Sequence, residues 1–222
     1  LYKKLSYDPI TSFKPVIALS DGITMLLVPQ DSRFKTLKDL IDYAKANPGK
    51  LNFGSAGVGS TIHLAGEMFK QIAGVDIVHI PYKGAGPALA DLLAGNTQLM
   101  FDTLGTALPP VKAGLLRPIG VSSASRIDDL PDVPTIAESG YPDYLVSVWY
   151  GIAAPSKLPE DVAERLRGSL DRALTDEVFR ASLTKVGFLP LRPQSQAAID
   201  KFIADDRARW SGVVKSLNIS LD

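Results

Sequence analysis

The chain lacks several residue types on which enzymes and secreted proteins often depend. None of its 222 residues is cysteine, and only two are histidine and three methionine. Without cysteine there is no disulfide, no thiol nucleophile and no cysteine-ligated metal site. The G-x-S-x-G and H-E-x-x-H patterns of hydrolases and zinc proteases are also missing. These absences favour a protein that binds a ligand without covalent chemistry, and without a metal or cofactor.

An excess of either charge and long apolar runs are missing as well. The 24 basic residues balance the 24 acidic ones, which indicates neither a nucleic-acid surface nor a polybasic membrane anchor. No apolar run approaches the roughly 20 residues of a membrane-spanning helix. The sequence begins at Leu1 and shows no signal peptide, so we expect a processed or truncated product. Its length suits one large domain or two small lobes.

What the chain does contain is a strand, a glycine-rich turn and an amphipathic helix within residues 51–83. The turn at 54–60 consists of small residues that let a ligand approach the backbone closely. Ser60 and Thr61 predict the start of the helix, and Gly74 predicts its end. A glycine turn that leads into a helix presents unpaired N–H groups to an anion. We predict a small-anion site here; the alternative is a tight turn whose glycines serve packing alone.

The glycine turn departs from two nucleotide-binding motifs. Gly54 and Gly59 have the spacing of a P-loop, but Ser60 stands where that motif has its phosphate-binding lysine. The dinucleotide pattern fails as well, because no third glycine follows Gly57 and Gly59 at the required spacing. Both departures disfavour a nucleotide as the ligand.

Strands and helices alternate along much of the chain. We expect strands at residues 16–19, 23–28, 77–80, 98–101 and 116–122, and helices at 36–46, 88–94, 107–112 and, weakly, 135–139. Further on, we expect an extended run at 144–153, a short one at 188–191, and helices at 160–175, 176–186 and 195–217. The alternation between residues 26 and 122 predicts a mostly parallel α/β sheet.

Three groups of unusual residues follow predicted strands of this sheet. They are Gly57, Gly59, Ser60, Thr61 and His63; then Tyr82, Lys83 and Gly84; and then Asp102 and Thr103. In open α/β sheets, ligands bind beyond the carboxyl ends of the strands. We therefore predict that the three groups converge on one ligand-binding site.

Each candidate side chain also has a purely structural explanation. Lys83 could pair with a ligand carboxylate or be a solvated loop lysine, and Tyr82 could offer a hydroxyl or an apolar wall, or pack beneath its loop. His63 could face the anion or be a packed structural histidine. Asp102 could accept from a ligand hydroxyl, an ammonium group or a water, or cap the next turn. For His79 we expect strand packing.

Longer motifs resemble a known family. They are KTLKDLIDYAKANPGKLNFGSAGVGSTIHLAGEMF, PYKGAGPALADLLAG, LMFD, LPPVKAGLLRPIGVSS, RIDDLPDVPTIAESGYP and WYGIAAP, in this order over nearly the whole chain. These motifs resemble the Bug family of extracytoplasmic solute receptors, which are similar to the binding component of tripartite tricarboxylate transporters. The resemblance implies a type II periplasmic-binding-protein fold, in which two α/β lobes joined by crossover strands close on a ligand. It also implies a periplasmic location and membrane transporter subunits as partners.

The resemblance assigns roles to the candidate residues. It implies that Gly57, Gly59, Ser60, Thr61 and His63 form a carboxylate-binding helix start, with Tyr82, Lys83 and Gly84 in the facing loop. Asp102, followed by Thr103, would be the acid that binds the ligand or a water. The ligands of the family are mostly small carboxylates, including dicarboxylates, tricarboxylates, acidic amino acids and aromatic acids.

In one respect the sequence departs from the family pattern. The family has a further strand–helix–strand region ahead of the part that Leu1 begins, so we expect an incomplete first lobe of residues 1–28 and 144–222. Residues 29–143 would form a second lobe of parallel βα units. Exposed apolar surface on the incomplete lobe is expected to favour oligomerisation. The alternatives are a truncated or decayed receptor, and a ligand-sensing domain of the same fold without a transport role.

Overall fold

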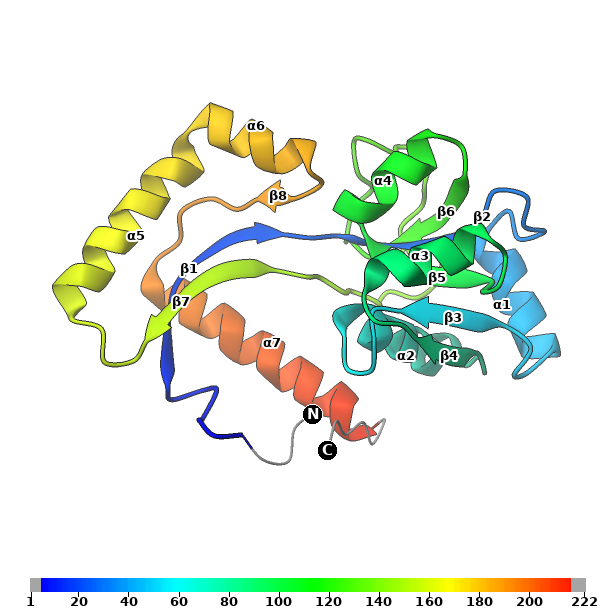
Figure 1. Cartoon of the computed structure of the whole chain (residues 1–222), viewed down its shortest axis with the longest axis horizontal. Coiled ribbons are helices and arrows are strands. Elements are labelled where there is room, and N and C mark those ends of the chain that lie inside the picture. Colours follow the sequence, from blue (N-terminus) through cyan, green and yellow to red (C-terminus); the bar gives the residue numbers. More distant parts are fainter. Residues whose placement is uncertain (1–4, 217–222) are drawn as a thin grey trace. The chain divides into compact units, whose positions relative to one another are not determined.

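The computed structural model describes residues 5–216 and divides the chain into two compact units (Figure 1). The first unit takes in residues 1–22 and 149–222, and the second takes in residues 23–148. The sequence-based boundaries at residues 28 and 143 therefore differ from those of the structure. At the first boundary the difference arises from β2 (Thr24–Pro29), which pairs with strands of the second unit.

The second unit contains a five-stranded sheet in the order β4-β3-β5-β2-β6. Besides β2, its strands are β3 (Asn52–Ser55), β4 (Val78–Pro81), β5 (Leu99–Thr103) and β6 (Leu116–Val121). Strand β3 is parallel to β4 and β5, whereas β2 is antiparallel to β5 and β6. A mostly parallel sheet was predicted, and β2 is the strand that departs from it.

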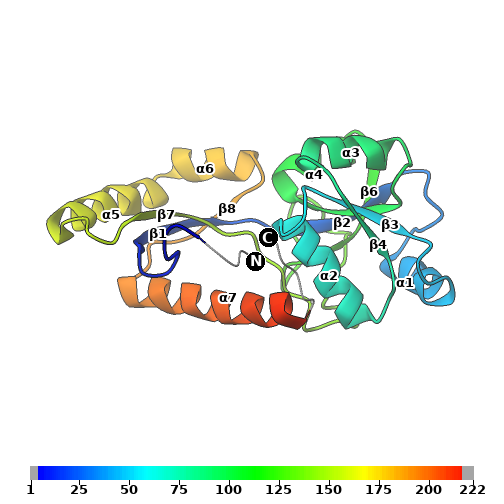
Figure 2. The same cartoon turned by 60° about the horizontal axis from the view of Figure 1, so that its bottom comes forward.

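Four helices pack on this sheet. Helices α3 (Ala85–Leu93) and α4 (Leu104–Lys112) lie on one side, and α1 (Leu37–Ala46) and α2 (Thr61–Ala73) on the other (Figure 2). Between α2 and the sheet, the rings of Phe69, Phe101 and Tyr144 lie within 6.0 Å of one another, measured between centroids. The buried hydroxyl of Tyr144 donates to the Ala65 carbonyl at 3.1 Å. This aromatic cluster fixes α2, and with it the start of the helix, relative to the sheet.

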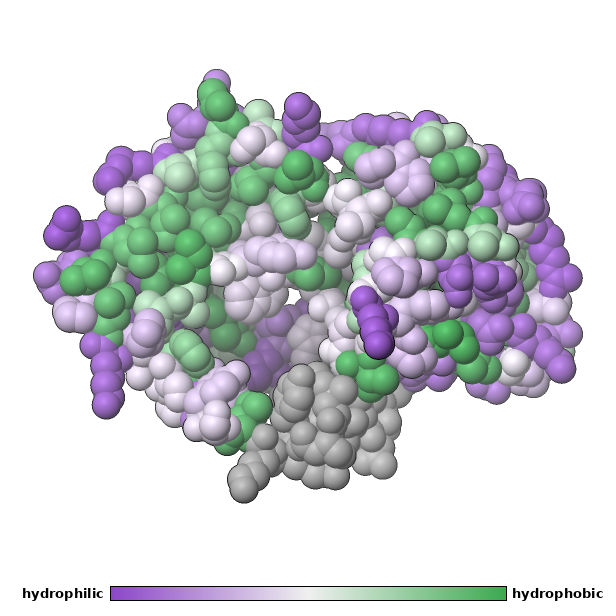
Figure 3. Space-filling model, viewed as in Figure 1, coloured by the Kyte–Doolittle hydropathy of each residue, from purple (hydrophilic) through white to green (hydrophobic). Residues whose placement is uncertain are grey.

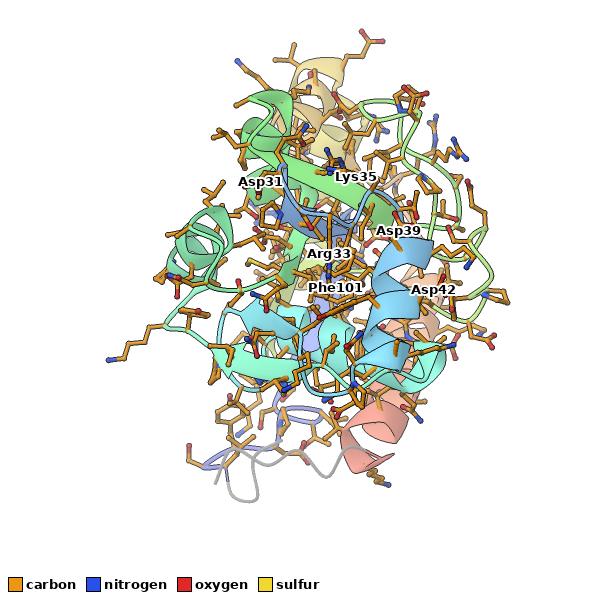
Figure 4. All side chains as sticks on the ribbon, turned by 90° about the vertical axis from the view of Figure 1, so that its right-hand side faces the viewer. Asp31, Arg33, Lys35, Asp39, Asp42 and Phe101 are labelled. Carbon is orange, nitrogen blue, oxygen red and sulfur yellow. The ribbon has the colours of Figure 1, made fainter. Side chains whose placement is uncertain are left out.

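Helix α1 begins with a reciprocal cap. Thr36 Oγ1 accepts from the Asp39 N–H at 3.2 Å, and Asp39 Oδ2 accepts from the N–H groups of Thr36 and Lys35 at 3.0 Å. Just before the cap, the Arg33 guanidinium lies 3.5 Å from the ring centroid of Tyr43 (Figure 4). The reciprocal hydrogen bonds of Thr36 and Asp39 satisfy N–H donors that a helix start otherwise leaves unpaired. The weak helix predicted at residues 135–139 is instead a series of turns.

The first unit has a three-stranded antiparallel sheet in the order β7-β1-β8. Its elements are β1 (Phe13–Asp21), β7 (Tyr150–Pro155), β8 (Leu189–Pro190), α5 (Glu160–Thr175), α6 (Glu177–Lys185) and α7 (Gln196–Ser216). The predicted helices agree closely with α5, α6 and α7; residue 217, which ends the predicted range, lies outside the described residues. Among the described helices of the chain, none is long and apolar enough to cross a membrane.

Several apolar side chains of the first unit are exposed. They belong to α5, α6, β7 and β8 or their edges: Tyr150, Val162, Leu166, Val178, Val186 and Leu189. Figure 3 shows apolar surface over this unit, on the left of the view. Association through this area stays a prediction.

Candidate functional site

The first candidate group forms a tight loop between β3 and α2, which we call the glycine loop (residues 55–60). Gly57 and Gly59 have φ angles of 121° and 77°, which only glycine adopts readily. Ser60 Oγ donates to the Gly57 carbonyl at 2.7 Å and accepts from the His63 N–H at 3.2 Å, so Ser60 is the N-cap of α2. Ser55 Oγ accepts from the Gly57 N–H at 3.1 Å. The sequence therefore predicted the start of this helix correctly.

The glycine loop leaves donors unpaired at the positive end of α2. Among the described residues, no acceptor bonds the N–H groups of Val58, Thr61 and Ile62. The first N–H groups of a helix have no intrahelical partner, and the helix dipole adds partial positive charge there. Gly59 differs, because its N–H already donates to Nδ1 of His63 at 3.0 Å. The loop can thus offer an anion the N–H groups on either side of Gly59.

His63 lies under the glycine loop, and His79 lies against it. The two imidazole rings stack with their centroids 3.8 Å apart and their planes at 21°. His79 comes from β4, and its Nε2 lies 2.6 Å from Ser55 Oγ. Burial lowers the pKa of His63, and burial together with the neighbouring His63 lowers the pKa of His79 to about 4. At neutral pH both rings are uncharged, and they support the loop from below.

The second group, Tyr82 to Gly84, follows β4 and lies beside the glycine loop. The Tyr82 N–H donates to the Ser55 carbonyl at 3.0 Å. A Cβ on Gly57 would lie 3.2 Å from the Tyr82 carbonyl oxygen, so the two loops touch. Gly84 has a φ of 115° and begins α3 without a side-chain cap. Lys83 is exposed and has no ion pair or hydrogen bond in the described part of the chain.

The hydroxyl of Tyr82 is already in use. It donates to Asp91 Oδ2 on α3 at 2.6 Å, and this bond raises the pKa of Tyr82 to about 12. On the other side, the Tyr82 ring covers Gly54, where a Cβ would lie 3.4 Å from Tyr82 Cε2. Of the roles expected for Tyr82, packing beneath its loop fits this geometry best.

The third group, Asp102 and Thr103, ends β5, which is the strand beside β3. Asp102 is 1% exposed, and its Oδ1 accepts from the Thr103 N–H at 2.8 Å. Its Oδ2 is buried and has no hydrogen-bond partner among the described residues. Burial raises the pKa of Asp102, while the nearby Thr106 hydroxyl and the hydrogen bond from the Thr103 N–H oppose that rise. A buried carboxylate oxygen without a partner is costly, so it favours a donor brought by water or ligand.

The structure brings the candidate residues to one edge of the sheet, because β3, β4 and β5 all end there. The glycine loop and the Tyr82 loop are in direct contact, and Asp102 and Thr103 end the neighbouring strand. Sequence reasoning missed Ser55 and assigned His79 to packing alone. Within the described residues, no group of three or more histidine or acidic side chains could hold a metal. The edge offers N–H donors and one free lysine, a combination that suits a carboxylate.

The comparisons with known proteins agree with this chemistry. The chain matches the tripartite tricarboxylate transporter family receptor over residues 1–219. The chain belongs to this receptor family. The match is to a family of receptors and not of enzymes or gene regulators, so the predicted family is confirmed and the ligand-sensing alternative is disfavoured.

The solved structures similar to this receptor-family chain include a periplasmic binding protein and two proteins with a bound carboxylate. Rpa4515 of R. palustris with adipate has a TM-score of 0.90 at 34% identity, with 100% of this chain and 74% of that chain covered. The periplasmic binding protein BugD has a TM-score of 0.87 at 32% identity, covering 99% and 74%. MatC of Rhodopseudomonas palustris with bound malate has a TM-score of 0.85 at 30% identity, covering 96% and 74%. The predicted α/β binding-protein fold is confirmed.

One relative of this receptor family is longer than this chain. A UPF0065 protein encoded in the tcbD-tcbE intergenic region of Pseudomonas sp. strain P51 is 35% identical over 214 residues. The match covers 96% of this chain and 63% of that relative, so the chain spans less than two thirds of the relative's length.

Proposed function

We propose that the protein is a periplasmic solute receptor that binds a small carboxylate at the glycine loop and delivers it to a membrane transporter of the tripartite tricarboxylate type. Binding involves no covalent step. The proposed ligand-contacting groups are the N–H donors around Gly57 to Thr61, the ammonium group of Lys83, and, through water, the carboxylate of Asp102.

The observation that carries this proposal is the set of unpaired N–H groups at the start of α2. Val58, Thr61 and Ile62 supply donors that nothing in the described part of the chain accepts. The helix dipole favours an anion at this point, and a carboxylate has two oxygens that accept several N–H bonds at once. Because the donors are backbone groups held by Ser60 and two glycines, the site needs little rearrangement to bind.

Lys83 supplies the positive charge that a dicarboxylate requires beyond one helix start. It is exposed, lies next to the glycine loop through Tyr82, and has no acidic partner among the described residues. A helix terminus balances about half an elementary charge, so a second cation favours a ligand with a second carboxylate. Rpa4515 and MatC, which are similar in fold, carry adipate and malate, and both are dicarboxylates.

Asp102 bears on which carboxylates bind well. Its orphaned Oδ2 accepts hydrogen bonds, yet the side chain is 1% exposed, so we assign it an ordered water as its partner. That water would in turn donate to the bound ligand. A ligand hydroxyl or ammonium group that replaces the water would satisfy the same oxygen, which favours hydroxy and amino dicarboxylates over plain ones.

The test is thermal unfolding of the protein against adipate, succinate, malate, citrate, glutamate and nicotinate. A ligand that binds the folded state at 100 times its dissociation constant adds about 2.7 kcal/mol, which moves the midpoint by a few degrees. Ser60→Ala and Lys83→Ala are expected to reduce the ligand-induced shift. Each variant is compared with its own ligand-free midpoint, because loss of the Ser60 cap lowers stability by about 1 kcal/mol by itself.

Lys50→Ala is the matched control for Lys83→Ala. Lys50 is also an exposed loop lysine without a side-chain partner among the described residues, but it lies at the opposite end of β3. The expected result is a saturable shift of the unfolding midpoint. Lys83→Ala should weaken the affinity derived from it by about three- to tenfold, with a larger effect at low salt than at high salt. Lys50→Ala should leave the affinity unchanged. No shift with any of the six ligands would overturn the proposal for these ligand classes.

A further inference from the structure

We propose that His63 and His79 are positioning residues for the glycine loop, and that carboxylate binding requires both rings to be neutral, so that acidification releases the ligand. This inference rests on the proposed function, because it concerns the same loop. It goes beyond that function by assigning the loop a built-in response to pH.

The Gly59 hydrogen bond determines the protonation of His63. A backbone N–H can only donate, so the Nδ1 atom that it meets at 3.0 Å must be an unprotonated acceptor. The proton of neutral His63 therefore resides on Nε2, which lies 3.9 Å from Glu67 Oε1. Protonation of His63 places a second N–H against that of Gly59 and breaks the bond. The peptide between Val58 and Gly59 then loses the contact that aims its neighbours at the ligand.

His79 fixes the other end of the loop through Ser55. Its Nε2 lies 2.6 Å from Ser55 Oγ, and the same hydroxyl accepts from the Gly57 N–H. The two histidines thus hold Gly57 and Gly59, two glycines of the loop that both have positive φ. Because their rings stack at 3.8 Å, a charge on one ring opposes a charge on the other.

Among the described residues, the charged side chains that act on the pair are Glu67 and Lys70, and both lie on α2. Glu67 favours protonation of His63, whereas Lys70 opposes it and also binds Glu67 Oε1 at 2.9 Å. Strand β3 contributes the uncharged Phe53, whose ring centroid lies 4.9 Å from that of His79, and Ser55. Strand β4 contributes His79 itself. Burial therefore outweighs the single favourable carboxylate, and the pair is neutral at pH 7.

The direction of the pH effect follows from the lowered pKa values of both histidines. The loop geometry is fully present above their ordinary value of about 6.5 and is lost as the pH falls through the lower values of the folded protein. A carboxylate that needs the neutral pair binds with constant affinity above pH 7. Below the pKa of His63, the affinity falls by at most tenfold per pH unit for each proton taken up.

The test compares pH profiles of carboxylate affinity between wild type, His63→Asn and His63→Leu. The probe is adipate or malate, whichever gives the larger thermal shift, measured by calorimetry from pH 8 to pH 5. In His63→Asn, the amide oxygen replaces Nδ1 as the acceptor for Gly59 and does not titrate. We expect His63→Asn to bind within about fivefold of wild type at pH 7.5, and to bind more tightly than wild type at the acidic end.

His63→Leu removes the acceptor and keeps a buried side chain of similar size. It is expected to bind about tenfold more weakly than wild type at pH 7.5, with the same pH dependence as His63→Asn. Protonation of the probe affects all three proteins equally. The ratio of wild-type affinity to variant affinity at each pH therefore reports the effect of His63 protonation alone. A constant ratio between wild type and His63→Asn across the pH range would overturn the inference while leaving the receptor proposal intact.

If no carboxylate binds, the receptor proposal itself fails. A second measurement then tests the positioning role of His63 without a ligand. The chain has only two histidines, so their imidazole resonances in NMR spectra are assigned with the variants. The Gly59 amide resonance is expected to titrate with the same pKa as His63, and to be less protected against solvent exchange below it. A Gly59 amide that does not respond when His63 titrates would overturn the positioning role. Where a ligand does bind, saturation is expected to lower the pKa of His63 by the amount that the affinity profile requires.

Discussion

The phenolic hydroxyl of Tyr82 donates a hydrogen bond to Asp91 Oδ2 at 2.6 Å and so ties the loop after β4 to α3. The bond raises the pKa of Tyr82 to about 12, and it lowers the pKa of Asp91 because a carboxylate is the better acceptor. A hydroxyl that is committed in this way has no further proton to give to a ligand.

We therefore expect Tyr82→Phe to change carboxylate affinity by less than threefold and to lower the unfolding midpoint slightly. The stability difference should be present above the ordinary pKa of aspartate, near 3.8, and vanish as the pH falls through the lowered pKa of Asp91. Calorimetric binding and thermal unfolding at pH 7 and pH 3 check both statements. A tenfold loss of affinity at unchanged stability would instead make the Tyr82 hydroxyl a ligand contact.

Asp102→Asn is expected to stabilise the ligand-free protein and to weaken binding. The amide oxygen keeps the Thr103 N–H bond, while the charge whose burial raises the pKa of Asp102 is removed. At pH 7 the gain should be about 1 kcal/mol in free energy of unfolding. Since the folded-state pKa is raised, protonation stabilises wild type as the pH falls, and the gain should shrink toward pH 4.

Urea unfolding at pH 7 and pH 4 measures the stability effect of Asp102→Asn, with Asp31→Asn as the control. Asp31 is exposed, so its substitution should leave stability nearly unchanged. We expect malate to lose more affinity than succinate, since its hydroxyl is the donor that Oδ2 would accept. Equal losses for both ligands would mean that the acid acts on the fold and not on ligand choice.

Gly57→Ala should weaken carboxylate binding by more than tenfold at a modest cost in stability. The φ of 121° strains any side chain, and the added Cβ would lie 3.2 Å from the Tyr82 carbonyl, so the two loops must move apart. Gly95→Ala is the control, because Gly95 also has a positive φ of 78° but has open space around it and lies after α3. Both variants should unfold at lower temperature, and Gly57→Ala alone should lose more than tenfold in affinity.

Local signals explain which parts of the site could be predicted from the sequence. Helix α2 begins after Ser60 and ends before Gly74, as predicted. A hydroxyl cap and a glycine at a φ of 62° each determine a helix end through contacts within one helical turn. The order of strands and helices from β3 to β6 was also predictable, because each element carries its own apolar period. Helix α3 begins at Ala85, earlier than predicted, because Gly84 and Gly86 obscure its start.

The contacts of His79 could have been predicted in part. Phe53 and His79 are direct partners in the β3–β4 register, and Ser55 lies two residues beyond Phe53 on the same face. Alternation along the strand therefore places Ser55 and His79 together on the side of α2. The register itself depends on tertiary pairing, as do the Tyr82–Asp91 bond and the direction of β2, and no local pattern specifies these.

The close packing of α2 on the sheet predicts that a glycine-to-alanine substitution in this helix lowers stability, whereas helix propensity alone predicts that it raises stability. A Cβ on Gly66 would lie 2.2 Å from Cε2 of Phe53, whose ring is fully buried against His79. Alanine favours a helix over glycine by about 1 kcal/mol, yet we expect Gly66→Ala to destabilise the protein by about 1–3 kcal/mol because the ring must move. Gly212→Ala in α7, where a Cβ meets nothing, should instead be neutral or stabilising.

Chemical unfolding of the two alanine variants measures the difference. The displaced Phe53 ring would press on the His79 ring, so Gly66→Ala should also weaken carboxylate binding, whereas Gly212→Ala should not. If Gly66→Ala proved as stable as Gly212→Ala, α2 would have room to move away from β3. The glycine loop, which joins that strand to that helix, would then not be held as rigidly as carboxylate binding by backbone donors requires.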